Sequence, residues 1–257
     1  MFLDWFVRHK RFGKFKKAFH TEVLPVRTLG SFPRVIHLYW DQGFDQAPEL
    51  VRRCVQSWTD QNPGWTIRLW ERSEADAIVP RAALPDGLKV TPYSDILRSE
   101  LLNRNGGVWA DATTFCTRAL DCWLLPVMAQ TDFFAFSRPG PDREIASWFL
   151  ASRPQAYVIA QLTAGVRRFW DRQEAPTRVY HWYQFVFEYL ARTSARFRRE
   201  WRTAPRLSAA PMLLLQDQLA GGELPDAEQL ALYRALPMHK LTHKRPIDLT
   251  KLEDLLS

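Results

Sequence analysis

Two short apolar runs on either side of a helical segment restrict the fold of this chain more than any other feature. Residues 33–40 and 65–70 have the β-branched and aromatic pattern of buried strands, and both are bounded by turn residues. Between them, Pro48 stands at the favoured first turn of a helix. The apolar stripe of that helix consists of Val51, Cys54, Val55 and Trp58. The order strand, helix, strand predicts a βαβ unit with two parallel strands, and therefore an α/β fold.

A second helix is predicted within residues 93–110, followed directly by a strand that runs back along it. Ser94 is a candidate N-cap, Asp95 is an acid in the expected first turn, and Asn105-Gly106-Gly107 ends the helix. Val108-Trp109-Ala110 has the pattern of a short buried strand. A helix of ten residues is about 15 Å long and a strand of four to five residues about 13 to 16 Å, so an antiparallel return nearly cancels the outward path.

This return predicts that three polar side chains meet. Asp111 ends the strand and is expected close to Asp95 and Arg98, at the strand ends where open α/β sheets bind polar ligands. Taken singly, each residue has a structural explanation, because Asp95 can pair with Arg98 on the helix and Asp111 can be a turn residue. Together, and directly after a Gly-Gly-x-Trp run, they favour a ligand site with Asp95, Arg98 and Asp111 as candidate catalytic residues.

The rest of the chain predicts a single domain over residues 31–257. Residues 71–92 are expected to hold a short helix and a proline-containing loop, and residues 132–137 a further strand before a turn at 139–141. From Glu144 onward the pattern predicts mainly helix, including segments at 155–170 and 178–196. The domain is therefore expected to be sheet-rich in its first half and helix-rich in its C-terminal half.

Residues 1–30 form a separate basic, amphipathic N-terminal segment. The first twenty residues hold six Lys or Arg against one Asp, and this segment carries most of the formal net charge of +7. Its aromatic residues follow helical spacing, which is typical of a helix lying on an anionic membrane surface. A helix that packs its aromatic face on the core explains the pattern equally well.

Several other classes of protein are disfavoured. The three cysteines include no CxxC pair, which argues against a zinc site or a disulfide framework and favours a reducing compartment. No signal peptide and no apolar run of 18 residues is present, so we expect a cytoplasmic protein, peripheral at most to the inner face of the cell membrane. Nucleic-acid binding is not expected, because the excess charge is terminal and no known nucleic-acid motif accompanies it.

A compact stretch near the C-terminus adds candidate ligands. His239 and His243 lie within five residues and are flanked by Lys240 and Lys244. A lone histidine is more often structural, but this grouping can complete a metal and diphosphate site opened by Asp111.

With these residues assembled, the chain resembles the bacterial capsular polysaccharide synthesis family. That family is similar in turn to the retaining glycosyltransferases of family 32, which carry a DxD sugar-binding motif. The matching blocks are His37-Leu38-Tyr39-Trp40-Asp41-Gln42-Gly43 with Ala47-Pro48, Ser94-Asp95-x-x-Arg98 with Leu101-Leu102, Gly106-Gly107-Val108-Trp109-Ala110-Asp111-Ala112-Thr113 and, more weakly, His239-Lys240-Leu241-Thr242-x-Lys244.

The resemblance implies a GT-A-like fold, a nucleotide-sugar donor such as a UDP-sugar, and Mn²⁺ or Mg²⁺ at the diphosphate. Under it, Asp111 binds the metal, Asp95 and Arg98 contact the donor sugar, and Trp40 lies beside the base. The implied donor-binding set consists of Trp40, Gly43, Asp95, Arg98, Trp109, Lys240 and Lys244. The second acid of DxD is replaced by Thr113, so the further metal ligand is left open between Thr113, His239 and His243.

The function implied is a retaining hexosyltransferase that acts on a cell-surface polysaccharide or lipid-linked oligosaccharide. The alternative is a catalytically silent scaffold of the same fold that binds a nucleotide or a glycan.

Overall fold

The computed structural model describes residues 31–245 and 248–256. The predicted N-terminal segment, residues 1–30, lies outside the described residues, and so does the choice between its two interpretations.

The centre of the fold is a five-stranded sheet with the order β2-β1-β3-β6-β5. β1 pairs in parallel with β2 and β3, whereas β6 runs antiparallel to both of its neighbours. The strands are β1 Val35–Tyr39, β2 Thr66–Trp70, β3 Gly107–Ala110, β5 Phe133–Gly140 and β6 Arg143–Ser152. The predicted parallel βαβ unit is confirmed, with Val35 opposite Thr66 and Tyr39 opposite Trp70.

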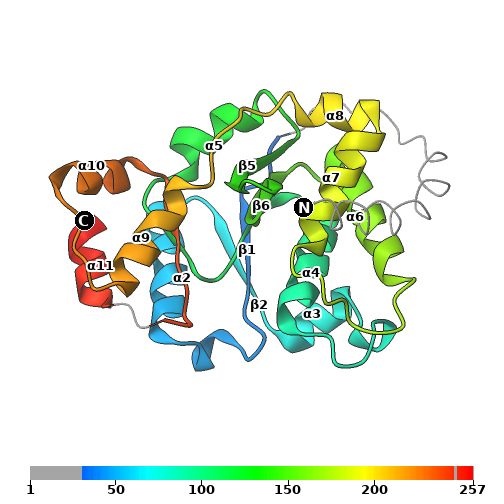
Figure 1. Cartoon of the computed structure of the whole chain (residues 1–257), viewed down its shortest axis with the longest axis horizontal. Helices are drawn as coiled ribbons and strands as arrows, with labels where there is room; N and C mark the ends of the chain where they lie inside the picture. Colours follow the sequence, from blue (N-terminus) through cyan, green and yellow to red (C-terminus); the bar gives the residue numbers. More distant parts are fainter. Residues whose placement is uncertain (1–30, 246–247, 257) are drawn as a thin grey trace.

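Helices cover both faces of this sheet. Figure 1 shows α3, α4, α6 and α7 on one side and α2, α9, α10 and α11 on the other. The helices are α2 Glu49–Gln61, α3 Arg72–Ile78, α4 Val90–Asn105, α5 Leu120–Met128, α6 Tyr157–Trp170, α7 Trp182–Thr193, α8 Ala195–Trp201, α9 Pro211–Ala220, α10 Ala227–Ala235 and α11 Leu249–Leu256, with short 3₁₀ turns at Phe44–Gln46 and Arg81–Ala83. The predicted mixed α/β fold, mainly parallel and helix-rich after the sheet, is confirmed.

A second, two-stranded sheet lies outside the central one. Here β4 (Thr114–Cys116) pairs antiparallel with β7 (Met238–Lys240), and Thr114 is opposite Lys240. This pairing joins the segment after β3 to residues more than 120 positions later in the chain.

Three predictions of secondary structure were wrong. The segment after Glu144 was expected to be helical, but β6 is a ten-residue strand, and β5 continues through Gly140 instead of ending before a turn at 139–141. Both faces of β6 are covered, so its apolar residues form a near-continuous run without the alternation that marks a half-exposed strand. In addition, α4 begins at Val90 with Lys89 as its N-cap, so Ser94 is not the cap and Asp95 lies beyond the first turn.

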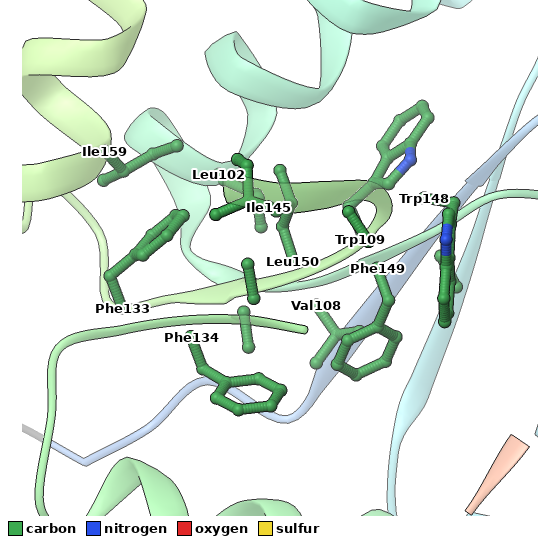
Figure 2. Packing of buried hydrophobic residues seen from close by; sticks show 14 of the residues in the cluster. Leu102, Val108, Trp109, Phe133, Phe134, Ile145, Trp148, Phe149, Leu150 and Ile159 are labelled. Atoms are coloured by element: carbon green, nitrogen blue, oxygen red, sulfur yellow. The ribbon is translucent and has the colours of Figure 1, made fainter. Parts of the chain in front are cut away.

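The core fills the space between the sheet and both helical layers. In Figure 2, Trp109 and Leu150 point toward one side of the sheet, and Val108 and Phe149 toward the other. This follows from the register, because Trp109 is opposite Leu150 and neighbouring residues of a strand alternate. On the α2 side, the ring of Trp58 stacks on Phe149 with centroids 6.1 Å apart.

The turn between α4 and β3 requires glycine. Gly107 has φ +87, and a Cβ atom there would lie 2.5 Å from the carbonyl oxygen of Val35 on β1. Since only glycine adopts this conformation readily and fits this space, α4 can return directly into the middle of the sheet.

A buried histidine ties this turn to β1. His37 Nε2 lies 3.1 Å from the Gly106 carbonyl and donates to it, while Nδ1 accepts from Trp70 Nε1 at 3.1 Å. Burial lowers the pKa of His37 to about 4, opposed by the Gly106 hydrogen bond. Protonation of His37 at Nδ1 would place its new N–H against the N–H of Trp70 Nε1, so that two donors would face each other.

We therefore expect the contribution of His37 to the free energy of unfolding to be lost as the pH drops from about 6.5 to about 4. A histidine whose pKa is lowered in the folded state contributes stability above its unfolded pKa and loses it as the pH falls through the folded pKa. Urea denaturation of wild type and His37→Asn at several pH values measures this as the difference between the two proteins, since the raised pKa of Asp95 and the lowered pKa of His239 act in both. The difference should shrink as the pH falls, and a difference that is the same at pH 7 and pH 4 would contradict the expectation.

No helix among the described residues is long and apolar enough to cross a membrane.

Candidate functional site

A cavity of about 670 Å³ opens at the carboxyl ends of β1 and β3. Trp40 and Asp41 line it directly after β1, and Asp111 lines it directly after β3. This is the predicted position, because ligands of open α/β sheets bind beyond the carboxyl ends of the strands.

Arg98 lines the cavity and is almost fully enclosed, with 3% of its side chain exposed. Nη1 forms an ion pair with Asp95 Oδ1 at 2.9 Å and donates to the Ser147 carbonyl at 2.7 Å, and Nη2 donates to Asp111 Oδ1 at 3.1 Å. Nε and Nη2 also donate to the carbonyl and hydroxyl of Ser94, at 3.2 and 3.1 Å. These contacts fix the guanidinium between Asp95 and Asp111, so its geometry is that of a group that positions the two carboxylates.

Asp111 presents one oxygen to the protein and the other to the cavity. Oδ1 accepts from Arg98 and from Trp109 Nε1 at 3.0 Å, and the backbone N–H donates to the Trp148 carbonyl at 2.8 Å. Oδ2 has no hydrogen bond from the described residues, and Lys240 Nζ lies 3.8 Å from it. With 28% of the side chain exposed, Asp111 is a fixed, accessible anion.

Asp95 is the more buried of the two carboxylates. Burial raises its pKa to about 7, Arg98 opposes the shift, and the neighbouring charge of Asp111 adds to it. The predicted grouping of Asp95, Arg98 and Asp111 is thus present, with one guanidinium shared between two carboxylates.

Lys240 reaches the same group from β7. Nζ donates to Thr113 Oγ1 at 2.5 Å and to the Leu241 carbonyl at 3.1 Å, with 18% of the side chain exposed. Burial lowers the pKa of Lys240, and the charge of Asp111 opposes this. The β4 and β7 pairing explains the position, because Lys240 is opposite Thr114.

An aromatic wall stands beside these charges. Trp40 meets the ring of His243 edge to face, with centroids 5.1 Å apart, and Lys244 follows on the same loop. All three line the cavity, so a flat ring bound here would have Trp40 beside it and two lysines close by.

Two of the predicted site residues are not among those that line the cavity. Gly43 has φ +82 and closes the turn after β1 with an N–H donated to the Trp40 carbonyl, so it shapes the loop. His239 is fully buried, and its Nε2 lies 3.0 Å from the Tyr233 carbonyl. Strand alternation puts His239 on the opposite face of β7 from Lys240.

The four predicted metal ligands therefore do not form a ligand set. Thr113 Oγ1 is occupied by Lys240, His239 faces away, and His243 packs on Trp40. Among the described residues, Asp111 Oδ2 and the ring nitrogens of His243 have no hydrogen bond, and both side chains line the cavity. In the described parts of the chain, no three His, Cys, Asp or Glu residues are grouped so that they could hold a metal. A divalent ion here would rest on one carboxylate oxygen and on the ligand's own oxygens.

Sequence reasoning missed a second buried carboxylate, Asp41. Its oxygens accept from Arg72, Arg81 and the hydroxyl of Tyr39, and these contacts lower the pKa of Asp41 against the effect of burial. The signal was available, because Asp41 follows β1 just as Asp111 follows β3. Its arginine partners, on α3 and on the 3₁₀ turn after it, were not predictable from spacing.

Further residues that line the cavity, from α7, β6 and the loop before α7, were also not predicted. Gln184 is buried on α7 and donates to Ser147 Oγ at 3.0 Å, and Trp148 follows Ser147 on β6. Tyr180 also lines the cavity, with 74% of its surface exposed. The cavity is therefore lined by polar and aromatic side chains as well as by the charged groups.

Comparison with known proteins identifies the family. The model of a family described as "Capsular polysaccharide synthesis protein" matches residues 9–256. The chain belongs to the capsular polysaccharide synthesis family. The predicted resemblance is confirmed, and the DxD motif is present only as Asp111-Ala112-Thr113.

Two individual proteins are similar to about half of this chain. The glycosyltransferase afumC of Aspergillus fumigatus is 29% identical over 160 residues, which are 54% of this chain and 41% of that protein. The O-glycosyltransferase braB of Annulohypoxylon truncatum is 26% identical over 155 residues, 52% of this chain and 37% of that protein. The aligned part thus spans about two fifths of the length of these relatives.

Among solved structures, the PaToxG glycosyltransferase aligns with a TM-score of 0.41 at 10% identity, covering 77% of this chain and 84% of that one.

Proposed function

We propose that this protein is a glycosyltransferase that moves a sugar from a nucleotide-diphosphate sugar, such as a UDP-sugar, to a cell-surface polysaccharide or lipid-linked oligosaccharide. The observation that carries the proposal is the carboxylate of Asp111, fixed by Arg98 and Trp109 at the end of β3 with Oδ2 facing a cavity lined by cations. Membership of the capsular polysaccharide synthesis family and similarity to two proteins named as glycosyltransferases support it.

The cavity has a place for each part of such a donor. The base fits beside Trp40 and His243, and the diphosphate fits at Lys240 and Lys244. The sugar then lies toward Asp95 and Gln184, whose side-chain oxygens can accept hydrogen bonds from hydroxyl groups.

In the transfer, the bond between the anomeric carbon and the diphosphate oxygen breaks, and its electron pair stays on that oxygen. The acceptor hydroxyl oxygen bonds to the anomeric carbon, and the hydroxyl proton passes to the departing diphosphate. Fixed cations near the diphosphate lower the barrier, because they stabilise charge that grows during the step. A divalent ion, if bound at Asp111 Oδ2, would supply the same kind of charge. Retention of configuration stays a prediction from the family resemblance.

A silent scaffold is the second candidate function. The observation in its favour is that Thr113 replaces the second acid of DxD and that the predicted metal ligands are not gathered. The cytoplasmic location and the contact of residues 1–20 with an anionic membrane remain predictions from the sequence.

Thermal denaturation with a panel of nucleoside diphosphates tests the donor site. A ligand at a hundred times its Kd adds about 2.7 kcal/mol to the free energy of unfolding, which raises the Tm by several degrees for a domain of this size. We expect such a shift with one base, and a smaller shift in Asp111→Asn. If no nucleotide raises the Tm of folded protein, the site binds something else and the glycosyltransferase proposal fails.

A further inference from the structure

The ammonium group of Lys240 lies where a metal bound to the Asp-x-Thr motif would lie. It is 2.5 Å from Thr113 Oγ1 and 3.8 Å from Asp111 Oδ2, which are the side chains at the two ends of that motif. A residue of β7 thus bridges both positions from which a DxD motif would hold its ion.

The surrounding charges are already balanced without an ion. Asp111 has Arg98 on Oδ1 and Lys240 facing Oδ2, and Thr113 is neutral. A divalent ion on Oδ2 would sit within a few ångströms of the Lys240 ammonium, and like charges at that distance repel strongly in a partly buried site. The second carboxylate that would offset this repulsion is absent, because Thr113 stands in its place.

Lys240 also has one N–H group available to bind a ligand. An ammonium has three N–H donors, and Lys240 uses two, to Thr113 Oγ1 and to the Leu241 carbonyl. The third has no hydrogen-bond partner in the described part of the chain, and the side chain lines the cavity. Lys244 lines the same end of the cavity and brings a second positive charge.

We infer that Lys240 replaces the divalent ion at this donor site, so that the diphosphate is bound by the Lys240 ammonium on Asp111 and Thr113 and needs no metal. This inference rests on the proposed function. Lys240 is then the group that contacts the diphosphate. Thr113, which stands where a DxD motif has its second acid, leaves space for the lysine side chain.

Isothermal titration of UDP, or of the diphosphate that the thermal panel selects, tests this inference in EDTA and in Mn²⁺. For the wild type we expect Kd values in the two buffers that agree within about twofold. Lys240→Met keeps an unbranched side chain, one heavy atom shorter, and removes the charge, and should weaken binding in EDTA at least tenfold. Lys251→Met, on the exposed face of α11, is the matched control and should leave Kd unchanged.

A double variant tests the inference from the other side, by restoring the second acid of the DxD motif and removing the lysine. Thr113→Asp combined with Lys240→Met restores two carboxylates and removes the lysine, and should bind the nucleotide only with Mn²⁺. Wild-type binding that is lost in EDTA would overturn the inference and leave the glycosyltransferase proposal standing. Unchanged EDTA binding in Lys240→Met would also overturn it. Absence of nucleotide binding in both buffers would overturn both proposals.

Discussion

Asp111→Asn is expected to lower kcat for sugar transfer at least about 100-fold, the scale of other deletions of a preorganised electrostatic group. The asparagine keeps an oxygen for Trp109 and Arg98, so the fold should be retained. It removes the negative charge that faces Lys240 and puts an amide group into the cavity in place of Oδ2. Transfer from the UDP-sugar picked by the nucleotide panel, followed by release of UDP, measures the effect.

Asp217→Asn is the matched control for this experiment. Asp217 pairs with Arg245 at 3.1 Å, and both side chains are largely exposed, so kcat should stay within about twofold of wild type. If Asp111→Asn retained more than a tenth of wild-type kcat, Asp111 would not be central to the chemistry. The silent-scaffold alternative predicts in addition that the biological function survives Asp111→Ala.

Arg98→Met is expected to have the largest effect on stability. Removing the guanidinium leaves two carboxylates, those of Asp95 and Asp111, without their shared counter-charge. Breaking a buried ion pair in this way typically costs about 3–5 kcal/mol. Urea denaturation measures the loss, and the same variant should lose most of its transfer activity because Asp111 is no longer held.

A second substitution separates charge from packing. Without Arg98 the pKa of Asp95 rises further, because Arg98 opposes the effect of burial. Asp95→Asn added to Arg98→Met should therefore recover part of the lost stability above about pH 7, where the wild-type carboxyl is ionised. Arg104→Met is the control on the same helix and should cost under about 1 kcal/mol. Arg104 is about half exposed and pairs with the buried Glu100 at 3.4 Å, but Arg167 donates to both oxygens of that carboxylate, so its charge stays paired in the variant. Equal losses for Arg98→Met and Arg104→Met would show that the shared ion pair adds little.

The parts of the fold that follow from local pattern were predictable. The βαβ unit came from apolar runs with clear turn residues between them, and the antiparallel return of β3 along α4 came from lengths alone. That return was enough to bring Asp95, Arg98 and Asp111 together.

Other features depend on pairing between distant segments. The sequence of β6 predicts helix, because both faces of this strand are buried and its apolar and polar residues therefore do not alternate. The position of Lys240 depends on β4 pairing with a strand more than 120 residues away, which no local signal reveals. The orientation of His239 could have been predicted, because residues 238–240 form a strand in which neighbours point to opposite faces.

β6 also supplies two of the contacts that hold the site. The carbonyl of Ser147 accepts from Arg98, and the carbonyl of Trp148 accepts from the backbone N–H of Asp111. A chain that has emerged only as far as residue 140 therefore contains every motif residue of the acidic group but lacks the backbone that fixes them. During synthesis the acidic group can therefore be fixed only after residues 147 and 148 have emerged. Lys240 is expected to join it last, because β4 and β7 pair across more than 120 residues and contacts between distant segments form slowly.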